Sequence, residues 1–330
     1  MKTLTILIPE GQNNLSSVIG PYKFFLKANK HYRSLGKEEI FRVQVAGVSG
    51  DSELYGGLFS IHPHASIRDI ARTDVLIIPA LAHENLEEVV KQNEEAVNWV
   101  LGQYRKGAEV ASICTGAFLL AATGLLEGRS CSTHWNAAAK FREMFPGVNL
   151  QTDRLITDEY GIYTNGGAFS FLNLMLYLIE KYYDRSTAIV CAKVFQVDID
   201  RNSQSPFTIF NGQKNHSDDV VLQAQAFLEK HLDAKVNMDE LAGNLSVSRR
   251  NFDRRFLKAT GNTPVEYQQR VKVEMAKKSL ETGRKTVNEV MYETGYSDVK
   301  AFRDLFRRIT GLSPQAYRNK YNKDVVDNVY

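Results

Sequence analysis

A cysteine stands where a predicted strand runs into a predicted helix, a position suited to nucleophilic chemistry. The short run Glu109–Ile113 reads as a strand and leads directly into Cys114, and the apolar, Ala-rich stretch Thr115–Leu126 reads as a helix. This strand–turn–helix pattern is typical of a nucleophile elbow, which holds a side chain at the carboxyl end of a sheet, where the helix N-terminus favours a thiolate. His134 follows in SCSTHW, at the predicted end of the next strand, and a Cys–His pair can act as nucleophile and base.

The role of Cys114 stays open between three interpretations: a residue lining the pocket of a ligand sensor, a buried structural residue, or a catalytic nucleophile. Neither an orienting carboxylate nor an oxyanion arrangement can be recognised beside it, so Cys114 and His134 are predicted as pocket residues, with no catalytic residue. Oxidation of a reactive thiolate, as in a redox sensor, is a further alternative. Cys131 and Cys191 are predicted core residues, and no cofactor or metal site is predicted.

A second group of residues is suited to binding nucleic acid. Two predicted helices, near 249–260 and 300–309, carry basic side chains opposite an apolar stripe. Arg and Lys can bind phosphates or guanine edges, and Asn251 can pair with adenine. The candidate DNA-binding residues are Ser248, Arg249, Arg250, Asn251, Arg254, Arg255, Lys300, Arg303, Arg307 and Arg308.

Both basic helices belong to a unit that is written twice between Met238 and Tyr317. Each copy predicts a short helix, a tight turn and a longer helix that ends at Gly with Pro beyond it. A basic amphipathic helix alone is often only a solvated surface, but two in tandem favour a pair of helix-turn-helix units that enter successive major grooves. Five residues recur at a constant offset: Phe252, Phe256, Gly261, Pro264 and Tyr267 return as Phe302, Phe306, Gly311, Pro314 and Tyr317.

The region before the repeat alternates predicted strands and helices. Such alternation predicts an α/β domain, a mostly parallel, flavodoxin-like sheet with helices on both faces, followed by an all-α domain with two helix-turn-helix units. The predicted strands are Leu4–Ile8, Phe41–Ala46 and Asp74–Pro79, with hairpins at Tyr55–His62 and Leu155–Thr164; the predicted helices include Ser17–Tyr32, Glu84–Lys106 and Ala168–Tyr183.

Length and charge predict two domains. The 330 residues carry a net charge of +3, but basic residues outnumber acidic ones only after Asp219, so the C-terminal part is the natural partner of a phosphate backbone. A polar, turn-rich stretch predicts a linker, which gives domains at 1–200 and 219–325 with the linker at 201–218. We expect no signal peptide, no membrane span and, with three scattered cysteines, a reduced cytoplasmic protein.

Two family resemblances follow from these motifs. Met238–Tyr321 resembles the AraC/XylS-type DNA-binding domain: GYSDVKAFRDLFRRITGLSPQAYR is similar to its signature, and Arg270–Leu280 to its linker helix. In this sequence Ser246 stands where the first turn often has Gly, and Met291 where the second unit often has Ala.

Ile6–Glu180 resembles the ThiJ/PfpI fold, which is related to class I glutamine amidotransferases. The resemblance rests on ICTGAFLLAATGLLEGRSCSTHW and TNGGAFSFLNLMLYLIE. Proteolytic members have His where Thr115 stands, and the loop that often supplies a Glu contains Asn13, Asn14 and Ser16 instead.

Together the resemblances imply a one-component bacterial transcription regulator that acts at the nucleoid. Its N-terminal domain would sense a small-molecule effector or dimerise, and its partners would be promoter DNA, a second copy and RNA polymerase. The first repeat would carry more of the base readout and the second more of the backbone anchoring. The alternative is a Cys-dependent hydrolase or aldehyde-processing enzyme with an appended DNA-binding domain.

Overall fold

The computed structural model describes residues 1–82, 85–214, 216–234 and 236–322. The chain divides into two compact units, Met1–Gln204 and Ser205–Tyr330. The division falls inside the stretch predicted as a linker. Glu84, position 215 of that linker and the end of the predicted second domain, 323–325, lie outside the described residues.

The first unit is built on a seven-stranded sheet with the strand order β10-β11-β7-β6-β1-β2-β5. Neighbouring strands are parallel except β10 and β11, which form the predicted antiparallel hairpin. The mostly parallel sheet is thereby confirmed. The strands are β1 Lys2–Ile8, β2 Phe41–Gly47, β5 Ala65–Ser66, β6 Val75–Ile78, β7 Glu109–Ile113, β10 Ile156–Glu159 and β11 Ile162–Asn165.

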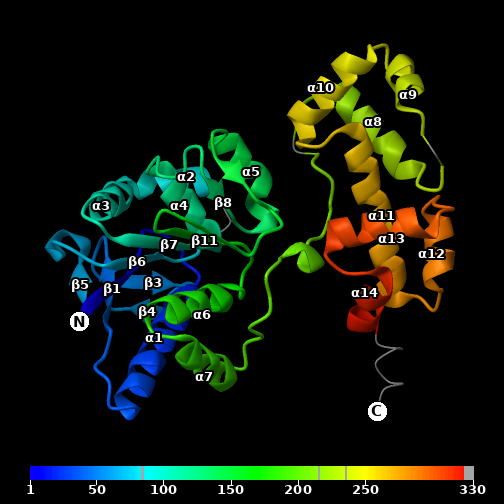
Figure 1. The fold of residues 1–330 in the computed structure, drawn as a ribbon. Helices are drawn as coiled ribbons and strands as arrows, with labels where there is room; N and C mark the ends of the chain where they lie inside the picture. Colours follow the sequence, from blue (N-terminus) through cyan, green and yellow to red (C-terminus); the bar gives the residue numbers. More distant parts are fainter. Residues whose placement is uncertain (83–84, 215, 235, 323–330) are drawn as a thin grey trace. The chain divides into compact units, whose positions relative to one another are not determined.

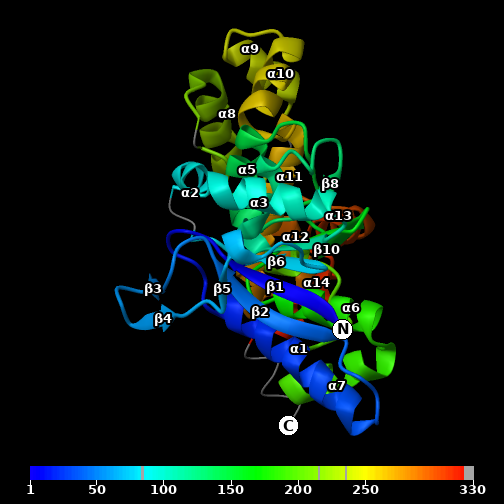
Figure 2. The same ribbon diagram turned by 90° about the vertical axis from the view of Figure 1, so that its left-hand side faces the viewer.

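Helices cover both faces of this sheet (Figures 1 and 2). On one face α1, α6 and α7 pack against each other and bury one apolar core against β1 and β2. On the other face α2 to α5 bury a second core against β6 and β7. The central strands are therefore buried on both sides, which explains their nearly continuous apolar sequence. The helices are α1 Ser16–Ser34, α2 Leu86–Gln92, α3 Glu94–Arg105, α4 Ala117–Ala122, α5 Ala138–Met144, α6 Phe171–Tyr182 and α7 Arg185–Phe195.

The prediction of one helix from Glu84 to Lys106 is wrong, because the helix is interrupted at Asn93. The Asn93 side chain is buried; it accepts from the Glu10 N–H at 2.7 Å and donates to the Glu10 carbonyl at 3.1 Å. A backbone segment distant in sequence thus fixes the break.

The strand predicted to end at His134 is also wrong. β8 is only Ser130–Cys131, and it pairs with β9 (Asn149–Leu150) rather than with the main sheet. The hairpin predicted around Gly56 and Gly57 is present as β3 (Ser52–Leu54) and β4 (Phe59–Ile61).

The second unit is helical and contains both predicted helix-turn-helix units, α9–α10 and α12–α13, connected by α11 (Figure 1). Each repeat has its own aromatic core: Phe252, Phe256 and Tyr267 in the first, and their counterparts at 302, 306 and 317 in the second. The helices are α8 Asp219–Lys230, α9 Met238–Asn244, α10 Arg249–Thr260, α11 Pro264–Thr282, α12 Val287–Glu293, α13 Val299–Thr310 and α14 Pro314–Tyr321.

The two turns have the same backbone conformation with different residues. Gly295 has φ +74° and Ser246 has φ +57°, both in the left-handed region. A side chain there costs about 1–2 kcal/mol, so the first turn adopts at some strain the geometry that glycine supplies freely in the second. Met291, which stands where the second unit often has Ala, is fully buried in the core of the second repeat.

Candidate nucleic-acid interface and pocket

The predicted elbow is present at the carboxyl end of β7. Cys114 has φ +54° and opens a tight turn, Cys114–Gly116, before α4. A Cβ at Gly116 would lie 2.5 Å from the carbonyl oxygen of Pro79, so only glycine lets the turn approach the end of β6. Hydroxyl groups hold the turn: Thr115 Oγ1 donates to Leu81 O at 2.8 Å, and Thr133 Oγ1 donates to Cys114 O at 2.8 Å.

The Cys114 thiol is buried, and burial raises its pKa to about 11. Hydrogen bonds from the backbone and hydroxyl of Thr115 and from the backbone of His134 lower the pKa by less than burial raises it. The turn before the helix therefore lowers the pKa in the expected direction, but burial outweighs it. Burial thus favours the protonated thiol, which is the less nucleophilic form.

His134 approaches Cys114 through its backbone. Its Nδ1 accepts from the Asn136 N–H at 3.1 Å and caps the turn Trp135–Ala137. The imidazole is absent from the described side chains that line the pocket beside Cys114. The His134 backbone thus gives Cys114 a hydrogen-bond donor, and the ring Nδ1 is bound to the Asn136 N–H.

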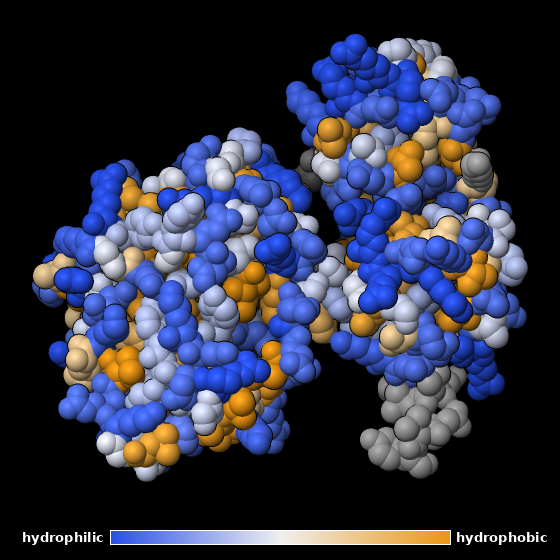
Figure 3. Space-filling view, in the orientation of Figure 1, coloured by the Kyte–Doolittle hydropathy of each residue, from blue (hydrophilic) through white to orange (hydrophobic). Residues whose placement is uncertain are grey.

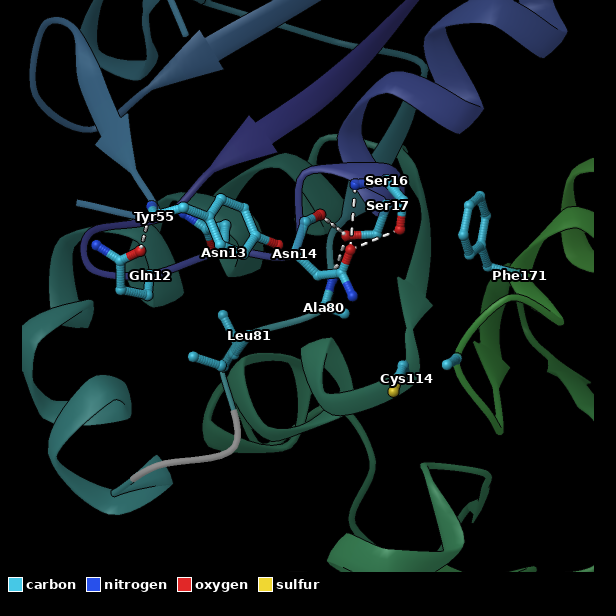
Figure 4. A pocket seen from close by; sticks show the side chains of 12 residues that line it. Gln12, Asn13, Asn14, Ser16, Ser17, Tyr55, Ala80, Leu81, Cys114 and Phe171 are labelled. Atoms are coloured by element: carbon cyan, nitrogen blue, oxygen red, sulfur yellow. Dashed lines mark hydrogen bonds between the residues drawn. The ribbon is translucent and has the colours of Figure 1, made fainter. Parts of the chain in front are cut away.

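Cys114 lines a pocket of about 230 Å³ at this end of the sheet. Figure 4 shows Gln12 and Tyr55 on one side, and Cys114 and Phe171 on the other. Among the described lining residues none carries a carboxylate, an imidazole or a charge. The described lining residues are Gln12, Asn13, Asn14, Ser16, Ser17, Tyr55, Ala80, Leu81, Ala82, Cys114, Ala168 and Phe171.

Asn13, one of the lining residues, has a buried acceptor without a hydrogen-bond partner among the described residues. Its Nδ2 donates to Pro9 O at 2.8 Å and to Gly11 O at 3.2 Å, which fixes the amide. Its Oδ1 is buried and has no hydrogen-bond partner among the described residues. A buried acceptor without a partner costs about 1–3 kcal/mol, so the loop between β1 and α1 carries a local cost at Asn13. The sequence of the loop between β1 and α1 indicated only that a carboxylate is absent there.

The second site is the surface formed by α10 and α13. Arg250, Arg254 and Lys258 are exposed along α10 at a spacing of four residues. On α13 the exposed Lys300, Arg303 and Arg307 follow at spacings of three and four, and therefore share one helix face. Figure 3 shows strongly hydrophilic surface over both helices.

Several candidate residues instead bind carboxylates or amides of their own unit. Arg255 forms a bidentate pair with Asp218, the N-cap of α8, at 2.6 and 2.8 Å. Arg249 binds Asp253 at 3.0 Å and Asp239 of α9 at 3.2 Å, which fixes the angle between the two helices of the first motif. Such contacts were not foreseen, because Asp218 and Asp239 lie far from their partners in sequence.

The remaining candidates have smaller local roles. Arg308 donates to Gln269 of α11 at 2.7 Å, and Arg254 donates to Asn251 at 2.9 Å. Ser248 is the N-cap of α10, as its sequence position predicted. In contrast, Arg250, Lys300, Arg303 and Arg307 make no side-chain hydrogen bond or ion pair with described residues.

Across the described ranges, no three His, Cys, Asp or Glu side chains gather in a way that could hold a metal ion. No helix within those ranges is both long and apolar enough to cross a membrane.

The chain combines a mostly parallel α/β unit that contains the elbow with two helix-turn-helix units that follow it in sequence and have exposed basic second helices. This combination defines a class of DNA-binding transcription regulators. The DJ-1/PfpI family model matches residues 7–181, more than half of the chain, and the chain belongs to this family. A helix-turn-helix domain model matches residues 241–320. The predicted combination of an AraC-type DNA-binding domain with a ThiJ/PfpI-like domain is confirmed.

Curated relatives align with this chain over two thirds or more of their own length. The HTH-type transcriptional regulator GbdR of Pseudomonas aeruginosa is 26% identical over 306 residues, which cover 92% of this chain and 80% of that protein. The HTH-type transcriptional regulator GlxA of Rhizobium meliloti is 28% identical over 224 residues, covering 66% and 67%. A crystal structure of a putative transcriptional regulator protein from Vibrio parahaemolyticus matches 58% of this chain and 98% of its own, with a TM-score of 0.52 and 24% identity, and shows the fold alone.

Proposed function

We propose that this regulator is a one-component switch. Its C-terminal unit binds promoter DNA, and its N-terminal unit binds a small-molecule effector in the pocket beside Cys114. The observation that carries the proposal is the set of exposed cations on α10 and α13 that have no protein partner among the described residues. The pocket of about 230 Å³ beside Cys114 supports the effector part, because its described lining combines amide and hydroxyl groups with the apolar Leu81 and Phe171.

On DNA, α10 and α13 enter successive major grooves, which recur about every 34 Å on one face of the duplex. Arg250, Asn251 and Arg254 read or anchor the first groove, and Lys300, Arg303 and Arg307 the second. Arg249 and Arg255 have a different role in this proposal. They hold α10 in place through carboxylates, and Arg308 does the same for α13 through Gln269.

Arg250 and Arg255 form a matched pair of variants that tests this assignment. Arg250→Ala should weaken binding to promoter DNA by about 1–3 kcal/mol. The slope of log K against log salt should fall by about one released counterion. Arg255→Ala removes the same charge from the same helix, but it should leave the salt dependence unchanged and lower the melting temperature by releasing Asp218. Fluorescence anisotropy at several salt concentrations, together with calorimetry, measures both. Equal salt slopes for the two variants would contradict the assignment.

We propose further that the N-terminal unit is a sensor and not an enzyme. The alternative of a Cys-dependent hydrolase needs a thiolate at Cys114 and a base beside it. Support for the sensor comes from the raised pKa of the thiol and from the use of the His134 ring as a cap.

The raised pKa predicts slow alkylation of Cys114. At pH 8 only about one thiol in a thousand would be ionised if its pKa is about 11, so iodoacetamide should react at least 100-fold more slowly than with a free cysteine. The rate should rise as the pH approaches the folded pKa, as long as the fold persists. Mass spectrometry separates Cys114 from Cys131 and Cys191. Rapid modification at neutral pH would favour the enzyme or redox-sensor alternative.

The proposal includes a homodimer, since two linked sites multiply affinity through effective concentration, and contact with RNA polymerase at the promoter. Because its target is chromosomal DNA, the regulator acts at the nucleoid in the bacterial cytoplasm. Genome-wide mapping of bound DNA, followed by mass measurement of the protein on a recovered site, tests the target and the stoichiometry together.

A further inference from the structure

The segment Ser205–Lys214, called the strap below, is bound along the linker helix of the DNA-binding unit. The Phe210 N–H donates to Glu274 Oε2 at 3.1 Å. Lys277 Nζ donates to the Thr208 carbonyl at 2.6 Å and to the same Glu274 oxygen at 2.7 Å. Glu274 and Lys277 are 9% and 4% exposed, so α11 holds a buried ion pair whose remaining hydrogen bonds go to the strap. Loss of the strap contacts would leave this pair incompletely satisfied.

The start of the strap contacts the second helix-turn-helix half. The Tyr321 hydroxyl at the end of α14 donates to Pro206 O at 3.1 Å. The Pro206 ring approaches the C-cap of α13, 3.8 Å from where a Cβ of Gly311 would lie. The amino end of the strap is therefore attached where the second recognition helix ends.

The far end of the strap contacts the first half. Phe210 packs edge to face on Tyr267, with ring centroids 5.3 Å apart. The Gln213 carbonyl accepts from Gln225 of α8 at 2.9 Å, and Lys214 pairs with Glu229 at 2.6 Å. The strap thus runs along α11 from one motif to the other, so a change in its position bears on both recognition helices.

The residue just before the strap is buried in the first unit. Gln204 is 1% exposed, and its Nε2 donates to Thr133 O at 3.0 Å. The Gln204 side chain fills space that is free only because residue 166 is glycine. A Cβ at Gly166 would lie 2.2 Å from Gln204 Nε2. Thr133 is the residue whose hydroxyl binds the Cys114 carbonyl. Thr133 therefore links the Cys114 elbow to Gln204 through hydrogen bonds. The peptide bond after Gln204 leads into the strap.

We propose that the strap transmits the state of the Cys114 pocket to the recognition helices. A ligand that moves the elbow moves Thr133, loosens Gln204 and alters the seating of the strap on Glu274 and Lys277. The spacing between α10 and α13 on DNA then changes. This inference rests on the proposed effector pocket, but the connection itself exists with or without a known ligand and can be tested without one.

Hydrogen–deuterium exchange of the full-length protein tests the connection at the Phe210 amide. Gln204→Met keeps the length of the side chain but removes its donor, and Thr133→Val keeps the shape but removes the bond to Cys114. Both should raise exchange of the peptide that contains Phe210 by roughly 10-fold, because the strap opens more often. Gln151→Ala is the control and should change nothing there, because the side-chain amide of Gln151 donates to Asn149.

Unchanged exchange at Phe210 in both variants, with the first unit still folded by circular dichroism, would overturn the proposal. So would a response to Gln204→Met alone, because the elbow would then not reach the strap. Failure of the proposed effector pocket has a different signature. Ala168→Trp, at an exposed position of the pocket lining, would then leave the response of the target promoters to growth conditions intact.

Discussion

Replacing Lys300, Arg303 and Arg307 of α13 together by alanine should abolish specific DNA binding. The three side chains lie on one exposed face and make no ion pair within the described residues, so their charge is available to DNA. Each contact is worth about 1–3 kcal/mol, and the loss of three should lower affinity by at least about 100-fold. The slope of log K against log salt should fall by about three counterions. Titrations of a genomic fragment at four salt concentrations give both quantities.

The matched control removes three exposed lysines from the other unit: Lys23 and Lys30 of α1 and Lys193 of α7. This variant has the same net charge as the α13 variant and should bind DNA like the wild type. Equal losses in the two variants would mean that binding follows overall charge, and α13 would then not be a recognition helix. The expectation that the first repeat carries more of the base readout remains a prediction. Two arginines of that repeat are bound to carboxylates, whereas Lys300, Arg303 and Arg307 make no ion pair with described residues.

Gly116→Ala should destabilise the first unit more than any surface change. The added methyl would lie 2.5 Å from Pro79 O and 2.8 Å from Ile78 O, and both atoms are backbone at the end of a central strand. Overpacking against groups that cannot rotate away costs about 3 kcal/mol or more, which for a domain of this size lowers the melting temperature by roughly 5–10 °C. Differential scanning calorimetry of the full chain measures the transition of this unit.

Gly102→Ala is the control for this substitution. Gly102 lies inside α3, and a Cβ there would meet no atom within 4 Å. Alanine in a helix interior is favoured over glycine by about 1 kcal/mol, so this variant should be slightly more stable. If both variants melted at the wild-type temperature, the elbow would not need a glycine at 116.

Local sequence features determined the architecture reliably. The repeated Phe, Gly and Pro positions predicted two helix-turn-helix units because each feature acts within a few residues: aromatics form the local core, and Gly ends the helix at φ +69° and +74° at positions 261 and 311. The turn at Ser246 was also predicted from the sequence, although serine disfavours a left-handed backbone conformation.

Structural features that depend on residues distant in sequence could not be predicted from the sequence. The apolar periodicity of α2 and α3 continues through Asn93, where the helix is interrupted and the Asn93 side chain binds the Glu10 backbone, 83 residues away. The same limit applies to the site. Arg255 belongs to the basic face by sequence, and its pairing with Asp218, 37 residues away, appears only in three dimensions. For Cys114, helix position alone suggested a thiolate, and burial reverses that inference.

The fit of Gln204 against Gly166 has a practical meaning for exchanging modules between regulators. A chimera that joins a foreign DNA-binding module at residue 200 would delete Gln204, leaving an unfilled space at Gly166 and depriving the Thr133 carbonyl of its donor. A junction between Gln204 and Ser205 preserves both, and it passes the whole strap to the C-terminal module. The two units should therefore be recombined at that peptide bond, more than twenty residues beyond residue 181, where the family match ends.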